Sequence, residues 1–518
     1  MLEQNPGKQL FIDDFFIESM QGARRVLNRP HKLTVDQPLE IVMDQPWEDA
    51  SAHHQRTVYI EDEQRFRLYY NSWIDARMLV CALDSDDGLN WSKPSLGLVE
   101  FRGSTDNNIT NCPAGGLIIW WDPHETDASR RWKRIDNKPT GMAEDGSPEW
   151  LAYVSADGYD WEVLPRGDHS EQPMLFNFGA PASGFGGVMN PDASYAFYSQ
   201  RGSGRRTRVL GRRDSDDFLN WSGLRTVIDQ DLDDPTGTEF YAAGFDPANR
   251  SDGGLRTLML HAFYTDVEEP YRIQGPAAYW GAEAGGPTAL PARVDGFVDT
   301  QLAVSRDTIH WTRWREPFLE RGATGAWDWG MVYGDAPILH KDRLFFFYGA
   351  SAQSHNGRTS NPLEGRYPRP KSWGKGLSVL RPDGYVHVEA DSFAPGSLTT
   401  HRFRQAAGGR ICVNADASTG YLRYELLEDT GATIPGFGVG DCNPIRVDTL
   451  CGELSWQGMP GWPPVGEPKR RAGLEDLSDG EFYIKIRFHL DPGAKLYSLT
   501  LDPPDVAVWG VPVPGRID

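Results

Sequence analysis

A seven-residue motif, Ser-x-Asp-x-x-x-Trp, recurs four times in this 518-residue chain and sets the strongest limit on its fold. Its copies are Ser85–Trp91, Ser155–Trp161, Ser215–Trp221 and Ser305–Trp311. Serine and aspartate side chains accept backbone N–H bonds and close tight turns, while tryptophan offers a large face for packing against a neighbouring sheet. A turn repeated in this way predicts a repeated structural unit.

Strand candidates surround each copy of the motif in the same order. An aromatic strand comes first in three units, at Phe66–Tyr70, Tyr195–Tyr198 and Leu344–Tyr348. A second strand then leads into the turn, at Met78–Leu83, Thr207–Gly211 and Thr300–Val304. One further candidate lies upstream of each pair, near Trp47–Ile60, Asp106–Trp121, Phe185–Met189, Thr238–Phe245 and Asp328–Leu339. A degenerate fifth copy of the turn is Leu380–Tyr385.

Five units of three or four strands predict an all-β chain. Sheets that repeat radially form a β-propeller, so we expect a five-bladed β-propeller. Aromatic residues make up 12% of the chain, and its 55 glycines and 37 prolines break it into short runs, which is typical of many strands and turns. A large β-sandwich or a solenoid is the alternative, and the recurring turn favours the propeller.

The pattern changes after about residue 385. Polar and apolar residues alternate with period two in Arg410–Ala415, Tyr421–Leu427, Phe482–His489 and Lys495–Leu501. This alternation predicts a C-terminal antiparallel β-sandwich with one solvated face. We therefore assign residues 1–390 to the propeller and residues 391–518 to the sandwich. The opening segment Leu10–Ile17 is expected to be a strand that pairs with the last blade.

The charge balance narrows the range of partners. Lys and Arg total 52 and Asp and Glu total 73, which gives a net charge of −21. Nucleic acids and anionic membranes require a basic surface, so neither is an expected partner. The chain has no apolar run long enough for a membrane span and no secretory signal in the sequence given, so a cytoplasmic location is expected.

The five cysteines are Cys81, Cys112, Cys412, Cys442 and Cys451. Their odd number and wide spacing indicate a reduced compartment rather than a disulfide framework. No Cys-x-x-Cys pair suggests zinc. No cofactor is predicted, although a structural or channel cation such as calcium is left open, as is homo-oligomer formation.

The first strand of each propeller blade lines the central channel, so acids on those strands are candidates for chemistry. Four are predicted to be catalytic: Glu48, Asp106, Glu239 and Asp328. The third blade offers no acid in Gly184–Val188. Acids at strand ends are more often turn caps, and Asp49, Asp233 and Asp234 look most like turn residues. The motif aspartates Asp87, Asp157, Asp217 and Asp307 are assigned to turns.

Carboxylates that converge in an aromatic-walled pocket suit glycoside hydrolysis, in which one acid donates a proton and a second attacks or activates water. Aromatic faces stack on sugar rings, and amides reach the hydroxyls. The predicted substrate-binding residues are Trp47, Asp49, Asn107, Asn108, Trp327, Tyr333, Asp335 and His355. His355 could face the channel, bind substrate or ligate a metal, and a loop histidine bonded to the backbone is the alternative.

The combination of repeated sheets, Ser-x-Asp turns and a trailing sandwich resembles the five-bladed glycoside hydrolases of families 32, 43 and 68. The segments Ser85–Pro94, Asp106–Ile109 and Ala326–Tyr333 look like a bacterial group labelled family-32-like, and the resemblance spans most of residues 10–502. The family signatures Trp-Asn-Asp-Pro-Asn, Arg-Asp-Pro and Glu-Cys are absent, so no catalytic residue carries over by motif.

Blade position alone gives the roles that the resemblance implies. A first-blade acid, Glu48 or Asp49, would be the nucleophile or base, Glu239 the proton donor and Asp106 the carboxylate that orients the sugar. The sequence therefore predicts a glycoside hydrolase or transglycosylase acting on a furanoside, either a fructoside or an arabinofuranoside. The alternatives are a non-catalytic carbohydrate-binding propeller and a metal-dependent or phosphorolytic sugar enzyme on the same scaffold.

Overall fold

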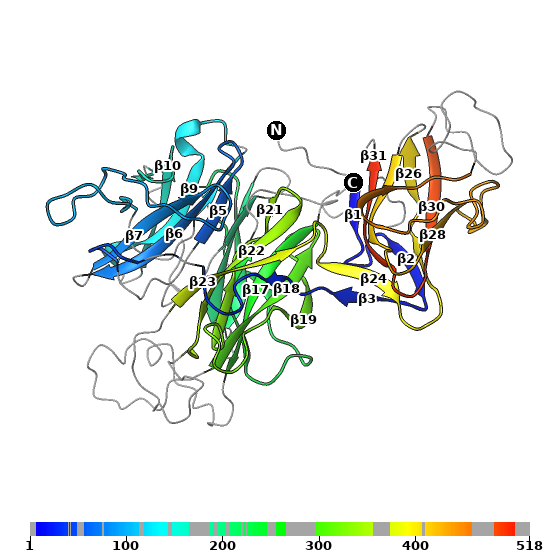
Figure 1. Cartoon of the computed structure of the whole chain (residues 1–518). Coiled ribbons are helices and arrows are strands. Elements are labelled where there is room, and N and C mark those ends of the chain that lie inside the picture. Colours follow the sequence, from blue (N-terminus) through cyan, green and yellow to red (C-terminus); the bar gives the residue numbers. More distant parts are fainter. Residues whose placement is uncertain are drawn as a thin grey trace. The chain divides into compact units, whose positions relative to one another are not determined.

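The structure is a computed structural model of the whole chain (Figure 1). It describes the following residues: 7–39, 41, 43–48, 56–74, 77–112, 119–123, 125–142, 148–164, 186–189, 194–202, 208–218, 221–223, 225–245, 255–265, 296–355, 373–406, 410–457 and 481–502. Apart from one 3-10 turn, η1 (Ala128–Arg130), all regular elements in these ranges are strands. The all-β class predicted from the sequence is therefore confirmed for the described residues.

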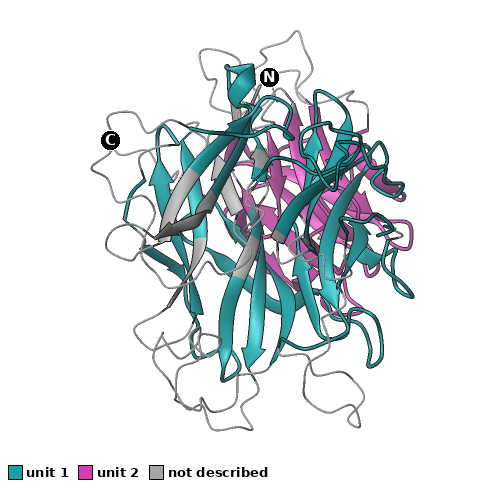
Figure 2. Ribbon diagram, turned by 90° about the vertical axis from the view of Figure 1, so that its left-hand side faces the viewer, with its two compact units in different colours: residues 1–2, 30–249, 257–379 teal, residues 3–29, 250–256, 380–518 magenta. Residues whose placement is uncertain are grey.

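The chain forms two compact units, coloured separately in Figure 2. The first unit comprises residues 1–2, 30–249 and 257–379, and the second comprises residues 3–29, 250–256 and 380–518. The boundary thus falls near residue 380, where the sequence suggested 390, and the N-terminal segment belongs with the C-terminal strands.

The first unit contains antiparallel sheets built from consecutive strands. Sheet I is β5 (Arg56–Ile60), β6 (Arg65–Ile74) and β7 (Arg77–Ser85). Sheet II is β8 (Ile119–Trp121), β9 (Trp132–Met142), β10 (Pro148–Ser155) and β11 (Glu162–Val163). Sheet III is β12 (Gly186–Met189), β13 (Tyr195–Gly202), β14 (Arg208–Ser215) and β15 (Arg225–Ile228).

The remaining nine strands of this unit form one sheet with two antiparallel parts, joined by a single parallel pair between Val298 and Met331. Sheet IV is β16 (Thr238–Phe245), β17 (Arg256–Thr265), β18 (Gly296–Ser305) and β19 (Thr312–Leu319). Sheet V is β20 (Met331–Gly334), β21 (Ile338–His340), β22 (Arg343–Ser351), β23 (Trp373–Leu380) and β4 (His31–Lys32).

The repeated motif occupies the same place in four of these sheets. Each motif serine is the last residue of the third strand of its sheet, namely Ser85 in β7, Ser155 in β10, Ser215 in β14 and Ser305 in β18. The prediction that the motif marks a structural repeat is confirmed. Because neighbouring strands are antiparallel, the motif turn of each sheet lies at the same end of the sheet as the last residue of the first strand.

Local hydrogen bonds explain why the motif needs serine and aspartate. In the first copy, Ser85 Oγ accepts the Gly88 N–H at 2.8 Å, and Asp87 accepts the N–H groups of Leu89 and Asn90, both at 2.8 Å. Burial alone would raise the pKa of Asp87, but these hydrogen bonds outweigh it and lower that pKa to about 2. The turn thus depends on an ionised aspartate at neutral pH.

The fourth motif position has a positive φ angle in every complete copy: 76° at Gly88, 78° at Gly158, 69° at Phe218 and 61° at Thr308. Left-handed backbone favours glycine, so the two non-glycine copies carry some strain. At Gly158 the surroundings also exclude a side chain, since a Cβ atom there would lie 2.6 Å from Tyr69 Oη and 2.8 Å from the Trp132 ring.

The first strands of successive sheets lie against one another: β5 against β8, β8 against β12, β12 against β16 and β16 against β20. The series returns to its start because Asp335, directly after β20, accepts the N–H of Thr57 in β5 at 3.1 Å. These first strands fall within the five segments predicted for them, beginning at Arg56, Ile119, Gly186, Thr238 and Met331.

The second unit has two antiparallel sheets. One orders β29 (Asp448–Glu453), β27 (Arg410–Asp416), β31 (Lys495–Asp502), β24 (Val386–Ala390) and β3 (Ala23–Leu27), with β1 (Lys8–Leu10) paired to β31. The other orders β2 (Ile17–Gln21), β25 (Gly396–Thr400), β30 (Glu481–Leu490) and β26 (Phe403–Ala406), with β28 (Leu422–Leu427) paired to β30. Alternate residues of both sheets, such as Val413 and Phe488, meet in one apolar core.

The N-terminal segment differs from its prediction. Leu10 in β1 pairs with Ser498, and Ile17 in β2 pairs with Thr400, so Leu10–Ile17 joins the second unit and not the last sheet of the first. The strand that completes sheet V is instead β4, in which Lys32 pairs with Ser378. The expectation that Leu10–Ile17 is one strand paired with the last blade is therefore wrong. Residues 11–16 form the turn between β1 and β2, and apolar side chains of this segment are part of the second unit's core.

The degenerate fifth turn follows β23 but makes different contacts. Its Asp383 accepts hydrogen bonds from Lys8 Nζ at 3.0 Å and from Ser498 Oγ at 2.7 Å. Because that carboxylate binds strands of the second unit, this copy no longer needs the motif serine or tryptophan.

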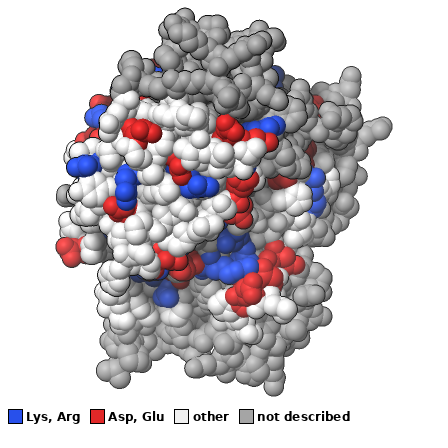
Figure 3. All heavy atoms as spheres, turned by 90° about the vertical axis from the view of Figure 1, so that its right-hand side faces the viewer, with Lys and Arg blue, Asp and Glu red and all other residues white. Residues whose placement is uncertain are grey.

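Acidic and basic side chains stand side by side over much of the face drawn in Figure 3. The excess of acidic residues in the sequence thus does not produce a field of one sign there. No helix in the described part of the chain is long and apolar enough to cross a membrane.

Candidate functional site

Polar and aromatic side chains from sheets III, IV and V lie at the strand ends opposite the motif turns; we refer to this side of the sheets as the edge. At this edge lie Glu239, the second residue of β16, and Arg208, the first residue of β14. Trp373 begins β23 at the same edge, and His355 follows the end of β22. We call the following residues the edge cluster: Arg208, Glu239, Tyr241, Phe263, Tyr333, His355 and Trp373.

Glu239 supplies the carboxylate of the edge cluster. Its side chain is 4% exposed, and Arg208 Nη1 lies 2.5 Å from its Oε2 atom. The Arg208 guanidinium also lies over the rings of Tyr241 and Phe263, 5.0 and 5.4 Å from their centroids. The ion pair with Arg208 holds the Glu239 side chain in a fixed position.

Aromatic rings surround this ion pair. Tyr241 lies 6.0 Å from both Phe263 and Tyr333, measured between ring centroids, and Tyr333 lies 5.8 Å from Trp373. Burial raises the pKa of Tyr333 well above its usual value, so its hydroxyl stays protonated. Aromatic faces beside one charged pair are a suitable surface for the apolar face of a sugar.

His355 belongs to the edge cluster, and its roles in the channel, in substrate binding or at a metal remain predictions. Its Nε2 atom lies 3.1 Å from Tyr241 Oη, and its ring lies 5.0 Å from the Phe263 ring. Its backbone N–H donates to Gly296 O at 2.9 Å. The edge cluster therefore unites three predicted site residues: Glu239, Tyr333 and His355.

Asp335 lies two residues beyond Tyr333, where β5 and sheet V meet. It accepts hydrogen bonds from Lys375 Nζ at 2.8 Å and from the Thr57 N–H at 3.1 Å, and Arg56 Nη1 lies 3.6 Å from its other oxygen. Burial lowers the pKa of Lys375, and Asp335 opposes that shift. Asp335 thus neutralises buried cations, and its role in substrate binding remains a prediction.

His261 in β17 lies beside this ion pair. Its Nε2 atom faces Gly334 O at 2.9 Å and must therefore carry the proton, and its ring lies 5.1 Å from the Tyr333 ring. Its Nδ1 atom has no hydrogen-bond partner among the described residues. Burial lowers the pKa of His261 to about 4, so the ring stays neutral at physiological pH.

This shift predicts a pH dependence of stability. In the unfolded chain a histidine binds a proton near pH 6.5, whereas folded His261 does so only near pH 4. As the pH falls from 7 to 4, the unfolded state gains this proton first, so the free energy of unfolding should decrease by about 3 kcal/mol through His261 alone. Denaturation of wild type and His261→Gln across this range should show the larger decrease in wild type.

His31→Gln provides the control for this measurement, because His31 is exposed. That variant should keep the pH dependence of wild type. An identical pH dependence in wild type and His261→Gln would show that His261 is not held neutral by burial.

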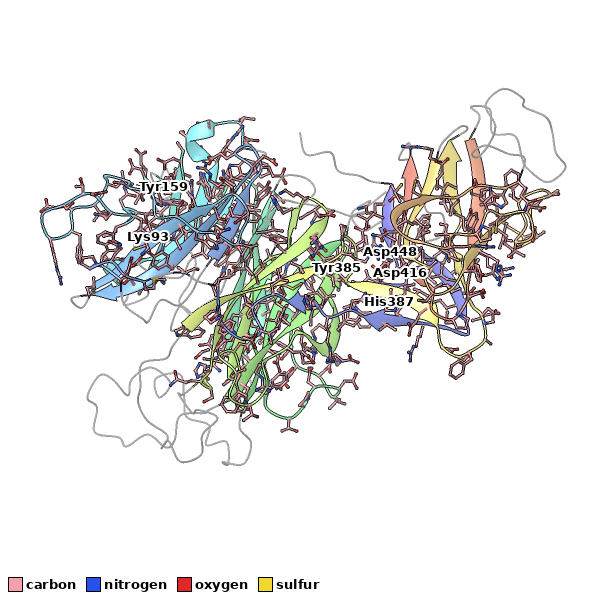
Figure 4. All side chains as sticks on the ribbon, in the orientation of Figure 1. Lys93, Tyr159, Tyr385, His387, Asp416 and Asp448 are labelled. Carbon is pink, nitrogen blue, oxygen red and sulfur yellow. The ribbon has the colours of Figure 1, made fainter. Side chains whose placement is uncertain are left out.

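Glu48, Trp47 and Asn108 form a separate group beside sheet I. The Glu48 side chain is fully buried and accepts hydrogen bonds from Lys93 Nζ at 2.7 Å and from the hydroxyl of Tyr70. Asn108 donates to that hydroxyl at 3.0 Å and accepts from Trp47 Nε1 at 2.8 Å. Lys93, labelled in Figure 4, follows the first motif turn and also binds Asp44 at 2.7 Å.

Asp328 and Trp327 form another group before β20. Asp328 is 1% exposed, and its carboxylate lies 2.5 Å from Lys32 Nζ of β4. The Trp327 ring stacks on Tyr348 with a centroid distance of 5.8 Å, and its Nε1 donates to Thr34 O at 2.9 Å. Asp328 and Trp327 therefore connect β4 and the residues directly after it to the rest of sheet V.

The remaining predicted residues have simpler surroundings. Asp106 is exposed, and the buried Asn107 donates to Val99 O at 2.7 Å. Asp49 lies outside the described residues. None of these three shares a described contact with Glu239, so their catalytic and substrate-binding roles remain predictions.

Asp299 in β18 is a buried acid that the sequence reasoning missed. Burial raises its pKa despite the opposing charge of Arg321, whose Nε lies 3.2 Å away. Glu239 pairs with Phe263 and lies on the same face of the sheet as that residue. Tyr264, the next residue, points to the opposite face, where it contacts Gln301. Asp299 is two residues from Gln301 and therefore lies on that opposite face as well. Asp299 and Glu239 therefore do not form an acid pair. A charged residue inside the buried run Phe297–Val304 was the available signal.

Among the described residues, no group of three or more His, Cys, Asp or Glu side chains could hold a metal ion. A channel cation such as calcium therefore stays a prediction without a described site.

Comparison with known proteins gives limited information. No protein-family model matches the chain, and no curated protein matches it. Similar solved structures include an N-acetylgalactosamine deacetylase from F. plautii in complex with blood group B trisaccharide, with 14% identity, a TM-score of 0.39, and coverage of 70% of this chain and 95% of that chain. The catalytic domain of the Coprinopsis cinerea GH62 alpha-L-arabinofuranosidase has 10% identity and a TM-score of 0.41, with coverage of 68% and 97%.

A thermostable family-43 glycoside hydrolase has 12% identity and a TM-score of 0.36, with coverage of 66% of this chain and 92% of that chain. These similar structures are of enzymes that act on carbohydrates. TM-scores below 0.5 carry no argument for the chemistry of this chain, which has to come from its own residues.

Proposed function

We propose that this chain is a glycoside hydrolase or transglycosylase that acts on a furanoside, either a fructoside or an arabinofuranoside. In this proposal the first unit is a five-bladed β-propeller, with sheets I to V as blades, and the second unit is a β-sandwich. The succession of first strands and the Thr57–Asp335 hydrogen bond support the propeller. The shared core of the two sheets supports the sandwich.

The observation that carries the proposal is the buried Glu239 carboxylate among the aromatic rings of the edge cluster. Rings such as Tyr241 and Trp373 would stack on the substrate. Glu239, held in place by Arg208, is the candidate nucleophile or general base. This assignment reverses the roles that the resemblance implies, in which Glu239 donates the proton and Glu48 or Asp49 is the nucleophile or base.

The test is a screen of aryl fructofuranosides, arabinofuranosides and galactofuranosides, followed by kinetics of Glu239→Gln on the best substrate. We expect this variant to lose roughly 10²–10⁴-fold in kcat/KM, since the amide can neither attack nor accept a proton. NMR of the product anomers would establish whether the reaction retains or inverts configuration.

Glu425→Gln is the matched control, because Glu425 is also a buried glutamate paired with an arginine, Arg487 at 3.2 Å, and it contacts His489 at 3.1 Å, but it lies in the second unit. It should keep wild-type turnover. Full activity of a folded Glu239→Gln would remove Glu239 from the mechanism, and thermal unfolding of both variants separates lost folding from lost chemistry.

A second candidate is a carbohydrate-binding protein without catalysis. It is favoured by the ion pairs at four predicted acids: Glu48 with Lys93, Glu239 with Arg208, Asp328 with Lys32, and Asp335 with Lys375. Wild-type protein that binds a furanoside in calorimetry but releases no product in the screen would support this function instead.

A further inference from the structure

Two cysteines of the second unit lie on neighbouring antiparallel strands. Cys412 is in β27 and Cys451 is in β29, and the register pairs Cys412 with Glu453 and Val413 with Gly452. Cys451 is two residues from Glu453, so it lies on the same face of the sheet as Cys412, one position along. Asp416 and Asp448, labelled in Figure 4, are paired at one end of these two strands.

An irregularity in the ladder brings the two thiols together. Between the pairs Val413–Gly452 and Ala415–Thr449 the register shifts, so that β29 has one residue more than β27. Such a bulge bends the strand and redirects its side chains. The Cys451 side chain is close enough to the Cys412 thiol to contribute to its raised pKa, and both cysteines are reduced.

The two thiols differ in their access to solvent. Cys451 is exposed, whereas Cys412 is 6% exposed. Burial, together with the Cys451 contact, raises the pKa of Cys412 to about 12. A dissolved reagent therefore reaches Cys451 first, and Cys412 can react only with a group already attached to its neighbour.

We propose that Cys451 and Cys412 form a reversible thiol–disulfide site, in which Cys451 attacks a small disulfide and Cys412 resolves the mixed disulfide. This inference does not depend on the proposed activity. In the first step, the Cys451 thiolate bonds to one sulfur of the small disulfide, the reagent's S–S bond breaks, and one reagent thiolate leaves. The Cys451 proton goes to water.

In the second step, the Cys412 thiol loses its proton to water and the resulting thiolate attacks the Cys451 sulfur. The Cys412–Cys451 bond forms, the mixed disulfide breaks, and a second reagent thiolate leaves. The two protein sulfurs are oxidised and the small disulfide is reduced, so the electrons balance. The product fastens the edge strand β29 to β27, which is an interior strand of its sheet.

Dithionitrobenzoate, an aromatic disulfide whose thiolate is coloured, tests this proposal on the folded full-length chain. Wild type should release two thiolates per chain and retain no adduct in its intact mass, because Cys412 displaces the second one. Cys412→Ser should release one thiolate and retain the adduct, and Cys451→Ser should release none on the same timescale.

Cys442→Ser is the control, since Cys442 is also a buried thiol of the second unit. It should behave as wild type, with two thiolates released. Wild type that releases one thiolate and keeps a stable adduct would overturn the proposal, as would release of two thiolates by Cys412→Ser. Peptide mass spectrometry should find the Cys412–Cys451 cross-link in the wild-type product and its loss after dithiothreitol.

Discussion

Replacement of Asp335 by alanine is expected to reduce the free energy of unfolding by about 3–5 kcal/mol. The Lys375 side chain is fully buried and that of Arg56 is 7% exposed, so both cations would lose their carboxylate without gaining water. The Thr57 N–H, which connects β5 to sheet V, would also lose its acceptor. Chemical denaturation monitored by tryptophan fluorescence measures this loss.

The exposed pair between Asp62 and Arg131 gives the control. Its side chains are 62% and 35% exposed, so Asp62→Ala should cost at most about 1 kcal/mol. Without Asp335, burial would lower the pKa of Lys375 further, and the unfolded chain would bind a proton that the folded variant lacks. The difference in free energy of unfolding between wild type and Asp335→Ala should therefore become smaller as the pH rises toward 10. A difference that becomes larger with pH would contradict this account.

The turns and strands could be predicted from the sequence because their causes are local. Ser85 and Asp87 bind backbone groups within five residues, so the motif alone fixes the turn and the end of the third strand. Alternating or aromatic runs then located β13, β22 and the C-terminal strands. Pairing partners were harder to predict: Leu10–Ile17 has the composition of a strand, but nothing in it specifies β31 and β25 as neighbours.

The candidate site was only partly predictable, because a carboxylate's role depends on partners that are distant in the chain. Asp328 is paired with Lys32, 296 residues away, and no local pattern reveals this. Glu239, Tyr333 and His355 were selected separately and do lie together. The other members of the edge cluster come from strands whose side-chain directions the sequence left open, namely Arg208, Tyr241, Phe263 and Trp373.

The ion pairs also explain why blade position is a weak guide to catalytic roles. Glu48 has the position of a first-blade acid, but its oxygens are occupied by Lys93, Tyr70 and the Gln45 N–H. Glu239 has one described cationic partner and aromatic neighbours on several sides.

Replacement of Trp132 by alanine is the second change with a large expected effect. Trp132 is 1% exposed in the core between sheets I and II, and the Arg67 guanidinium lies 5.2 Å from its ring centroid. Removal of a buried tryptophan leaves a large cavity, so the free energy of unfolding should fall by about 3–5 kcal/mol. Trp132→Phe, which fills part of the volume, should lose less.

A double-mutant cycle with Gly158 tests whether the Trp132 ring is what requires glycine in the second motif turn. Gly158→Ala places a Cβ atom against the ring, whereas Gly97, with a similar φ of 71°, has no atom within 4 Å of that position. Gly97→Ala therefore measures the cost of the backbone angle alone, and Gly158→Ala should cost more. In the Trp132→Ala background the cost of Gly158→Ala should fall but stay above that of Gly97→Ala, because Tyr69 Oη and Arg67 Nη1 still lie 2.6 and 2.8 Å from the added Cβ atom. Additive costs would show that Trp132 is not an obstacle.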